Sequence, residues 1–189
     1  MLSVVVLGHR IQVLKRALTQ NKKIFNSLDS YIQKSIRLLY EKGAQRFFVL
    51  GSSGVDTWCT QNLVVFKETH PELNITMVKS TPDQNSSWPK SSLLEHERLC
   101  EKVDQVITLN HNPGNSRKIF NRNEWVVNRS DFILAFEFPE IVAGGFTQML
   151  DYAKMRRVPT LMVDMYNLNQ GYDSLKEVVL QKRAFKDCG

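Results

Sequence analysis

Short apolar runs punctuate the chain at six places, and most consist of β-branched or aromatic residues in unbroken succession. The first, Val4-Val5-Val6-Leu7, is typical of a strand that is buried on both faces of a sheet. We expect strands at residues 3–7, 47–50, 75–78, 106–109, 132–136 and 160–163.

Between these runs, apolar residues recur three or four positions apart, which is the spacing of an amphipathic helix. One such helix is expected between Ser27, a suitable N-cap, and Gly43, a suitable end. Ser92 and Glu95 form a capping-box pattern before another helix. Further helices are expected at residues 55–69, 92–102, 116–128, 146–156 and 172–184, with a short one at 13–18 inside an otherwise polar connection that reaches residue 26.

The alternation of strands and helices predicts the fold class. Short apolar strands that alternate with helices form a doubly wound, mostly parallel α/β sheet with helices on both faces. No repeat, linker or low-complexity tract interrupts the pattern. We therefore expect one domain over residues 1–189, with a core at about 3–164 and a C-terminal helix at about 172–184.

The amino-acid composition indicates the class of protein and its expected location. The 189 residues carry a net charge of +6, and 42% of them are hydrophobic, which is the composition of a globular domain. The three cysteines are odd in number and lack CxxC spacing, so we expect neither a disulfide framework nor a metal site. Because no apolar run approaches the length of a membrane span, a cytoplasmic protein without a membrane partner is expected.

In a parallel sheet, ligands bind outside the carboxyl ends of the strands. The loop after the first strand is Gly8-His9-Arg10, where glycine permits close backbone approach and arginine suits phosphate. The alternative is a turn glycine with an exposed arginine. The loop after the second strand is Gly51-Ser52-Ser53-Gly54, followed by Asp56 in the first helical turn. Asp56 is a candidate for a ribose hydroxyl, or simply complements the helix dipole.

Two further loops have unusual composition. The polar segment from Thr81 to Lys90 contains Trp88, which is either a stacking surface for a base or an anchor packed on its own domain. Gly144-Gly145-Phe146-Thr147 leads into a helix and suits a phosphate approached by backbone N–H groups, or is an ordinary loop capped by Thr147. Arg122 and Asn123 precede the fifth strand, and Arg122 either reaches the same edge or forms a surface salt bridge with a neighbour such as Glu124.

These residues resemble a known family. Gly51 to Trp58 is similar to the Gly-x-x-Gly-[Ile/Val]-[Asp/Glu] pattern of the SLOG superfamily, the Rossmann-like domains of DprA and the LOG proteins. Arg122, Ser130-Asp131 and the segment 144–147 resemble its Arg…Ser-Asp…Gly-Gly-x-Gly-Thr pattern. The similarity is greatest to the YpsA type and spans about residues 4–163. It implies a Rossmann-like sheet whose glycine loops bind nucleotide-derived ligands, sometimes in a homodimer.

The chain departs from the LOG pattern at the position of the catalytic glutamate. LOG phosphoribohydrolases carry a glutamate three residues after the threonine of the glycine motif, whereas this chain has Leu150 there. Asp151 is one residue late, a rotation of about 100° on a helix. Asp56, Glu124 and Glu137 are the other acid–base candidates, and no position is a confident catalytic residue.

Three functions remain in competition. The first is a binding module that senses or sequesters a nucleotide-derived small molecule, such as an ADP-ribose-type or cyclic nucleotide, without a further cofactor. The second is a hydrolase of an N-glycosidic or phosphoester bond. The third is single-stranded DNA binding of the DprA type, which the positive charge favours but which ranks last because basic and aromatic residues are not interleaved. A homodimer is expected, and nucleic acid is not the expected partner.

Overall fold

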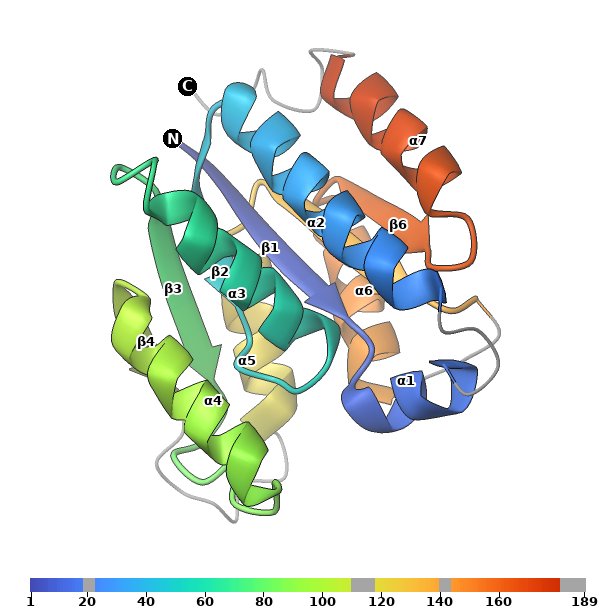
Figure 1. The fold of residues 1–189 in the computed structure, drawn as a ribbon. Helices are drawn as coiled ribbons and strands as arrows, with labels where there is room; N and C mark the ends of the chain where they lie inside the picture. The colour runs from blue at the N-terminus through green and yellow to red at the C-terminus, as the bar shows by residue number, and fades with distance from the viewer. Residues whose placement is uncertain (19–22, 110–117, 140–143, 181–189) are drawn as a thin grey trace.

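The structure is a computed structural model that describes residues 1–18, 23–109, 118–139 and 144–180. Within these ranges the chain forms six strands and seven helices that alternate along most of its length (Figure 1). The strands are β1 (Leu2–Gly8), β2 (Ala44–Val49), β3 (Asn74–Lys79), β4 (Gln105–Thr108), β5 (Phe132–Glu137) and β6 (Thr160–Asp164). The helices are α1 (Ile11–Leu18), α2 (Lys23–Glu41), α3 (Val55–Lys67), α4 (Lys90–Lys102), α5 (Lys118–Val127), α6 (Gly144–Met155) and α7 (Leu168–Leu180).

The strands form one sheet in the order β4-β3-β2-β1-β5-β6, and every neighbouring pair is parallel. The strand order reverses at β1, which lies between β2 and β5. This is the doubly wound, Rossmann-like arrangement predicted from the sequence, and it opens a crevice at the carboxyl ends of β1 and β5.

Helices cover both faces of the sheet. One face carries α2, α3, α4 and α7, and the other carries α5 and α6 (Figure 1). Because successive strand residues point to opposite faces, β1 divides its side chains between two cores. Val4 and Val6 pack with the larger helical layer, whereas Val5 and Leu7 pack with α5 and α6. In the described part of the chain, no helix is both long and apolar enough to cross a membrane.

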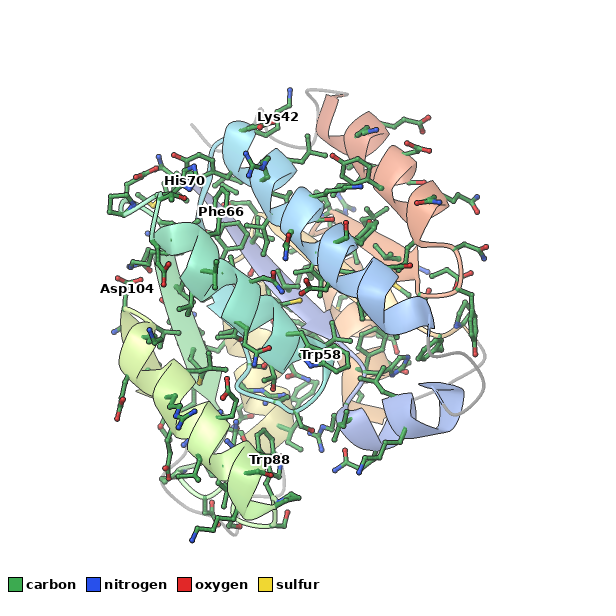
Figure 2. The ribbon with its side chains drawn as sticks, in the orientation of Figure 1. Lys42, Trp58, Phe66, His70, Trp88 and Asp104 are labelled. Atoms are coloured by element: carbon green, nitrogen blue, oxygen red, sulfur yellow. The ribbon has the colours of Figure 1, made fainter. Side chains whose placement is uncertain are left out.

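Two aspartates fasten the amino edge of the sheet. Asp131 accepts a hydrogen bond of 2.7 Å from the backbone N–H of Ser3, and Asp104 accepts one of 2.8 Å from that of Ile75. Asp131 belongs to the Ser-Asp pair of the family pattern, so that pair acts at the edge opposite the carboxyl-end loops. In Figure 2, Trp88 lies at the carboxyl end toward which the strands point, and His70 lies at the other end.

Several helices begin earlier than the sequence predicts. Helix α2 starts at Lys23, so Ser27 lies inside it and is not its N-cap. Helix α4 starts at Lys90, directly after Pro89, and makes no side-chain cap hydrogen bond. The predicted capping box at Ser92 is therefore wrong, because Glu95 instead accepts a hydrogen bond of 2.9 Å from Gln61 on α3.

The other boundaries differ by a few residues. Helix α6 starts at Gly144 rather than at residue 146, so it includes the two glycines that were expected to precede it. Helix α7 starts at Leu168 rather than at residue 172. The predicted helix start at residue 116 and helix end at residue 184 lie outside the described residues.

Candidate functional site

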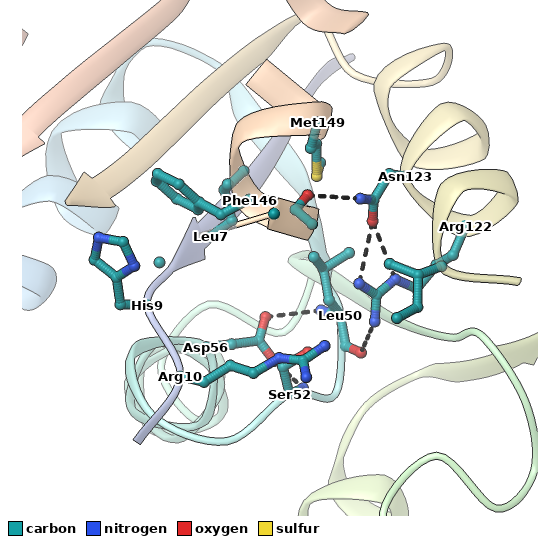
Figure 3. Close-up of a pocket in the computed structure, with 14 residues that line it drawn as sticks. Leu7, His9, Arg10, Leu50, Ser52, Asp56, Arg122, Asn123, Phe146 and Met149 are labelled. Carbon is teal, nitrogen blue, oxygen red and sulfur yellow. Dashed lines mark hydrogen bonds between the residues drawn. The ribbon is translucent and has the colours of Figure 1, made fainter. Parts of the chain in front are cut away.

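A cavity of about 250 Å³ lies at the carboxyl end of β1, the strand at which the strand order reverses (Figure 3). It unites three of the segments singled out in the sequence: the loop after β1, the loop after β2 and the start of α6. Its walls are Leu7, Gly8, His9, Arg10, Leu50, Ser52, Asp56, Ile119, Arg122, Asn123, Gly144, Gly145, Phe146 and Met149. The arrangement matches the position at which α/β sheets bind their ligands.

Two glycines allow the loops after β1 and β2 to touch. Gly54 caps α3 with a left-handed φ of 94°, and the N–H of Val55 donates to the carbonyl oxygen of His9 at 3.3 Å. A Cβ atom on Gly54 would lie 2.5 Å from that oxygen, and one on Gly8 would lie 2.7 Å from the Cβ of Val55. These glycines therefore serve a close contact between two loops of the protein itself.

Asp56 holds the loop after β2 in place. Its side chain is 2% exposed, and its two oxygens accept hydrogen bonds from the N–H groups of Leu50 at 2.8 Å and Ser52 at 2.7 Å. Burial raises the pKa of Asp56 to about 6, although these N–H groups and the nearby Arg122 favour the charged form. Two N–H groups of the loop thus point inward to Asp56, and the loop presents its serine side chains to the cavity.

Arg122 is buried, so the surface salt bridge considered for it is wrong. The side chain is 5% exposed and donates to the carbonyl oxygen of Leu50 at 3.4 Å and to Asn123 Oδ1 at 3.1 Å. Asn123 in turn donates to the carbonyl oxygen of Gly145 at 3.0 Å. These bonds join the loop after β2, helix α5 and the start of α6 (Figure 3).

Arg10 and Arg122 enter the cavity from opposite sides (Figure 3). Burial lowers the pKa of Arg122 to about 10; Asp56 acts in the other direction, and the positive charge of Arg10 adds to the lowering. Arg122 remains protonated near neutral pH. Two arginines and one buried carboxylate line the cavity, and the local charge favours an anionic ligand.

Backbone and aromatic groups complete the first cavity. Gly144 and Gly145 form the first turn of α6, whose leading N–H groups lack partners within the helix. The Phe146 ring centroid lies 4.8 Å from that of His9, which is 1% exposed and stacks on Phe138. A helix N-terminus beside two arginines suits a phosphate, and the apolar wall suits a flat ring.

A second cavity of about 330 Å³ adjoins the first and shares Arg10, Ser52, Ile119 and Arg122 with it. It is the more polar of the two, and the loop after β3 forms most of its wall. The remaining lining residues are Gln12, Ser53, Ser80, Thr81, Asp83, Gln84, Asn85, Ser86, Ser87 and Trp88. Trp88 is half-buried with its ring edge-on to His96 of α4, so it is both anchored on the domain and part of the cavity wall.

Several predicted residues lie away from these two cavities. Thr147, Glu137 and Asp151 line a third cavity of about 470 Å³ beside β6, which has Phe146 in common with the first. Leu150, at the position of the LOG glutamate, packs against the core between the sheet and α6. Burial and the neighbouring Asp164 raise the pKa of Glu137. Glu124, on α5, is not among the residues that line the described cavities.

Some residues that shape the two cavities could not be identified from the sequence. Gln84 donates to the carbonyl oxygens of Leu50 and Gly51 at 3.2 and 2.9 Å, and thereby ties the loop after β3 to the loop after β2. Ile119 stands in the wall between the two cavities. A polar residue in a polar loop and an apolar residue in a helix carry no pattern that separates them from their neighbours.

Among the described residues, no group of three or more His, Cys, Asp or Glu side chains is arranged to hold a metal ion. Cys59, on α3, is fully buried in the core, and burial raises the pKa of its thiol. The site as described is suited to binding through hydrogen bonds and charge.

Three UPF0398 proteins are similar in sequence to much of this chain. A UPF0398 protein of Halalkalibacterium halodurans is 27% identical over 143 residues, which are 75% of this chain and 71% of that protein. A UPF0398 protein of Leuconostoc citreum is 26% identical over 144 residues, 72% of this chain and 75% of that protein. One from Bacillus pumilus is 23% identical over 122 residues, 64% of this chain and 66% of that protein.

A solved structure shares the fold. DNA processing protein A from Helicobacter pylori, described for its single-stranded DNA binding mode, superposes with a TM-score of 0.58 at 15% identity, covering 95% of this chain and 79% of that one. A family model named YpsA, described as the YspA SLOG family, matches residues 4–168. The chain therefore belongs to the YpsA family of SLOG proteins.

Proposed function

We propose that this protein binds a nucleotide-derived, phosphate-containing small molecule across the two adjoining cavities. The observation that carries the proposal is their shared wall, in which Arg10 and Arg122 flank the switch point of the sheet. Asp56 is the carboxylate that lines the same cavity. Both of its oxygens already accept hydrogen bonds from backbone N–H groups. A phosphate between the arginines supplies the missing negative charge.

The surroundings support a nucleotide rather than a bare anion. The start of α6 directs helix N–H groups and the positive end of the helix dipole to the same place. Leu7, Phe146 and Met149 offer apolar contacts to a base on one side of the arginines. Hydroxyl and amide side chains line the other side.

We propose binding without turnover, as in a sensor or in a protein that sequesters a signalling nucleotide. The position of the LOG glutamate is Leu150, which packs against the core. Glu137 and Asp151 lie on the separate cavity beside β6. Incubation with AMP, NAD or ADP-ribose, followed by chromatography of the nucleotides, should return them unchanged; stoichiometric cleavage that Asp56→Asn abolishes would instead establish a hydrolase.

A thermal-shift screen of nucleotides tests the proposal directly. A ligand at one hundred times its Kd should add about 2.7 kcal/mol to the free energy of unfolding. The screen should include ADP, ADP-ribose, NAD and cyclic nucleotides, and failure of every nucleotide to raise Tm would refute the proposal.

Single-stranded DNA binding is the second candidate, because the protein from Helicobacter pylori with the same fold is described as a binder of single-stranded DNA. The net charge of +6 is compatible with it. A fluorescent oligothymidine separates the two candidates. If DNA is the main ligand, its affinity should fall steeply as the salt concentration rises. Nucleotides should also displace the oligothymidine, because both would bind at the same edge of the sheet.

Substitution of Arg10 should weaken nucleotide binding while the fold persists. Arg10 is exposed and lines both cavities, so Arg10→Ala removes a phosphate contact without emptying the core. We expect affinity for ADP or ADP-ribose to fall at least about tenfold by isothermal titration calorimetry, with little change in Tm, as for loss of a charge-assisted hydrogen bond.

Arg156→Ala is the matched control. Arg156 is an exposed arginine just beyond the far end of α6, and its loss changes the net charge by the same amount. Its affinity should equal that of the wild type. An equal loss in both variants would mean that the affinity reflects overall charge and not a site at Arg10.

A further inference from the structure

Two sulfur-containing side chains and one imidazole meet between helix α4 and strand β3. Helix α4 lies on the β3 and β4 side of the sheet (Figure 1). His96 and Cys100 are four residues apart on α4, so they share one face of that helix. Cys100 Sγ lies 3.4 Å from His96 Nε2 and 3.5 Å from the Sδ atom of Met77 on β3. None of the three is among the residues that line the described cavities.

The cluster is largely shielded from water. Met77 is 1% exposed and His96 is 6% exposed, whereas Cys100 is only partly buried. A Cβ atom on Gly51 would lie 3.0 Å from the Met77 sulfur and 3.1 Å from His96 Cε1. Both side chains therefore converge beneath Gly51, and Cys100 is the member of the cluster that solvent reaches.

The donor atoms suit a soft metal ion rather than the metals that His, Cys and carboxylate side chains hold. Thiolate and thioether sulfur select Cu(I), and imidazole nitrogen also binds copper. Burial lowers the pKa of His96 to about 4, so its ring is neutral at pH 7 and keeps a nitrogen lone pair for a metal. Burial raises the pKa of the Cys100 thiol, so a cation that binds there must displace the thiol proton into solvent.

Geometry and charge both favour a monovalent ion. A metal bonded to sulfur at about 2.3 Å and to nitrogen at about 2.0 Å holds such donors about 3.5–3.8 Å apart at tetrahedral angles. The observed separations of 3.4 and 3.5 Å need only a slight adjustment to reach these values. Exchange of the thiol proton for Cu(I) leaves the buried charge unchanged, whereas Zn²⁺ would add a positive charge and normally takes a fourth ligand.

We propose that Met77, His96 and Cys100 form a binding site for Cu(I). The ligands are the thiolate sulfur of Cys100, the thioether sulfur of Met77 and one ring nitrogen of His96, and the thiol proton leaves to solvent. The ion lies behind the loop after β2, because Met77 and His96 bound the space beneath Gly51. This site is separate from the proposed nucleotide site and does not depend on it.

Titration of the reduced protein with the Cu(I) complex of bicinchoninate tests the site. The reference protein is Cys188→Ser, so that the thiol of Cys188, outside the described residues, does not contribute. It should remove one Cu(I) per chain from the coloured chelate, as the wild type should, and native mass spectrometry should show the same stoichiometry. No uptake of Cu(I), or uptake by the wild type alone, would overturn the proposal.

Met77→Leu is the sharpest variant, because leucine nearly keeps the side-chain volume and removes the sulfur while every thiol remains. Its affinity for Cu(I) should fall at least about tenfold, and that of Cys100→Ser at least about a hundredfold. The matched control is Met155→Leu, since Met155 is 68% exposed and lies at the end of α6. Its affinity should equal that of the reference protein. Equal affinities of Met77→Leu and Met155→Leu, or retention of Cu(I) by Cys100→Ser, would overturn the site.

X-ray absorption at the copper edge gives a readout that needs no variant in the site. The Cu(I)-loaded reference protein should show two sulfur ligands and one nitrogen ligand around the metal. A shell that contains a single sulfur, or sulfur alone, would assign the ion to other side chains and overturn the proposal.

Discussion

Replacement of Gly54 by alanine is expected to destabilise the protein by more than about 3 kcal/mol. Gly54 has a left-handed φ of 94°, which costs other residues about 1–2 kcal/mol. The added Cβ would also lie 2.5 Å from the carbonyl oxygen of His9 and 2.8 Å from the N atom of Ile11. Both atoms belong to backbone, so relief requires the loops after β1 and β2 to separate.

Gly43 provides a control that isolates the clash. It has nearly the same φ, 95°, but a Cβ there would meet no heavy atom within 4 Å. Gly43→Ala should therefore cost only about 1 kcal/mol, the conformational part. Urea denaturation followed by circular dichroism measures both values. Equal losses would show that the two loops do not touch in solution as described.

Asp56→Ala is expected to cost about 4 kcal/mol in the free energy of unfolding at pH 8. The substitution leaves the N–H groups of Leu50 and Ser52 without their acceptor and removes the negative charge nearest to the buried Arg122. Asp173→Ala is the control, because Asp173 is an exposed carboxylate in an i,i+3 ion pair with Lys176. Its loss should change stability by less than about 0.5 kcal/mol. A small effect of Asp56→Ala would mean that Asp56 does not hold the loop.

The same carboxyl group should give stability a distinctive pH dependence. Its pKa is about 6 in the folded protein against an ordinary value of 3.8, so the folded state binds the proton more tightly. The stabilisation from this protonation is complete below pH 4 and is lost as pH rises through 6. Unfolding free energies measured between pH 4 and 7 should fall with this slope in the wild type and lack it in Asp56→Ala; parallel curves would contradict the shifted pKa.

The strands and their order of appearance were predictable because the apolar runs are short, unbroken and separated by helical spacing. Helix starts were less predictable, since they depend on contacts between elements. Ser92 and Glu95 have the spacing of a capping box, yet Glu95 bonds to Gln61 on another helix and α4 begins at Lys90. The start of α2 at Lys23 falls in a polar segment whose sequence favours a loop.

The location of the site followed from the sheet topology, whereas the role of each residue did not. Glycine at positions 8 and 54 indicates close approach, but only the fold shows that the approach is to another loop. Asp56 has a sequence position suited to a ribose or a helix dipole, and only the fold shows that both of its oxygens accept backbone N–H groups. Thr81 was a loop candidate, but the lack of a partner for its hydroxyl is visible only in three dimensions.

The position of β1 at the centre of the sheet also bears on the order in which the chain folds. β1 can pair with β2 early, but its contact with β5 joins Ser3 to Asp131, 128 residues apart, and must close a long loop. The first cavity exists only after that late pairing. We expect the folding transition state to lack this pairing. A ligand bound in the first cavity should then slow unfolding and leave the folding rate almost unchanged.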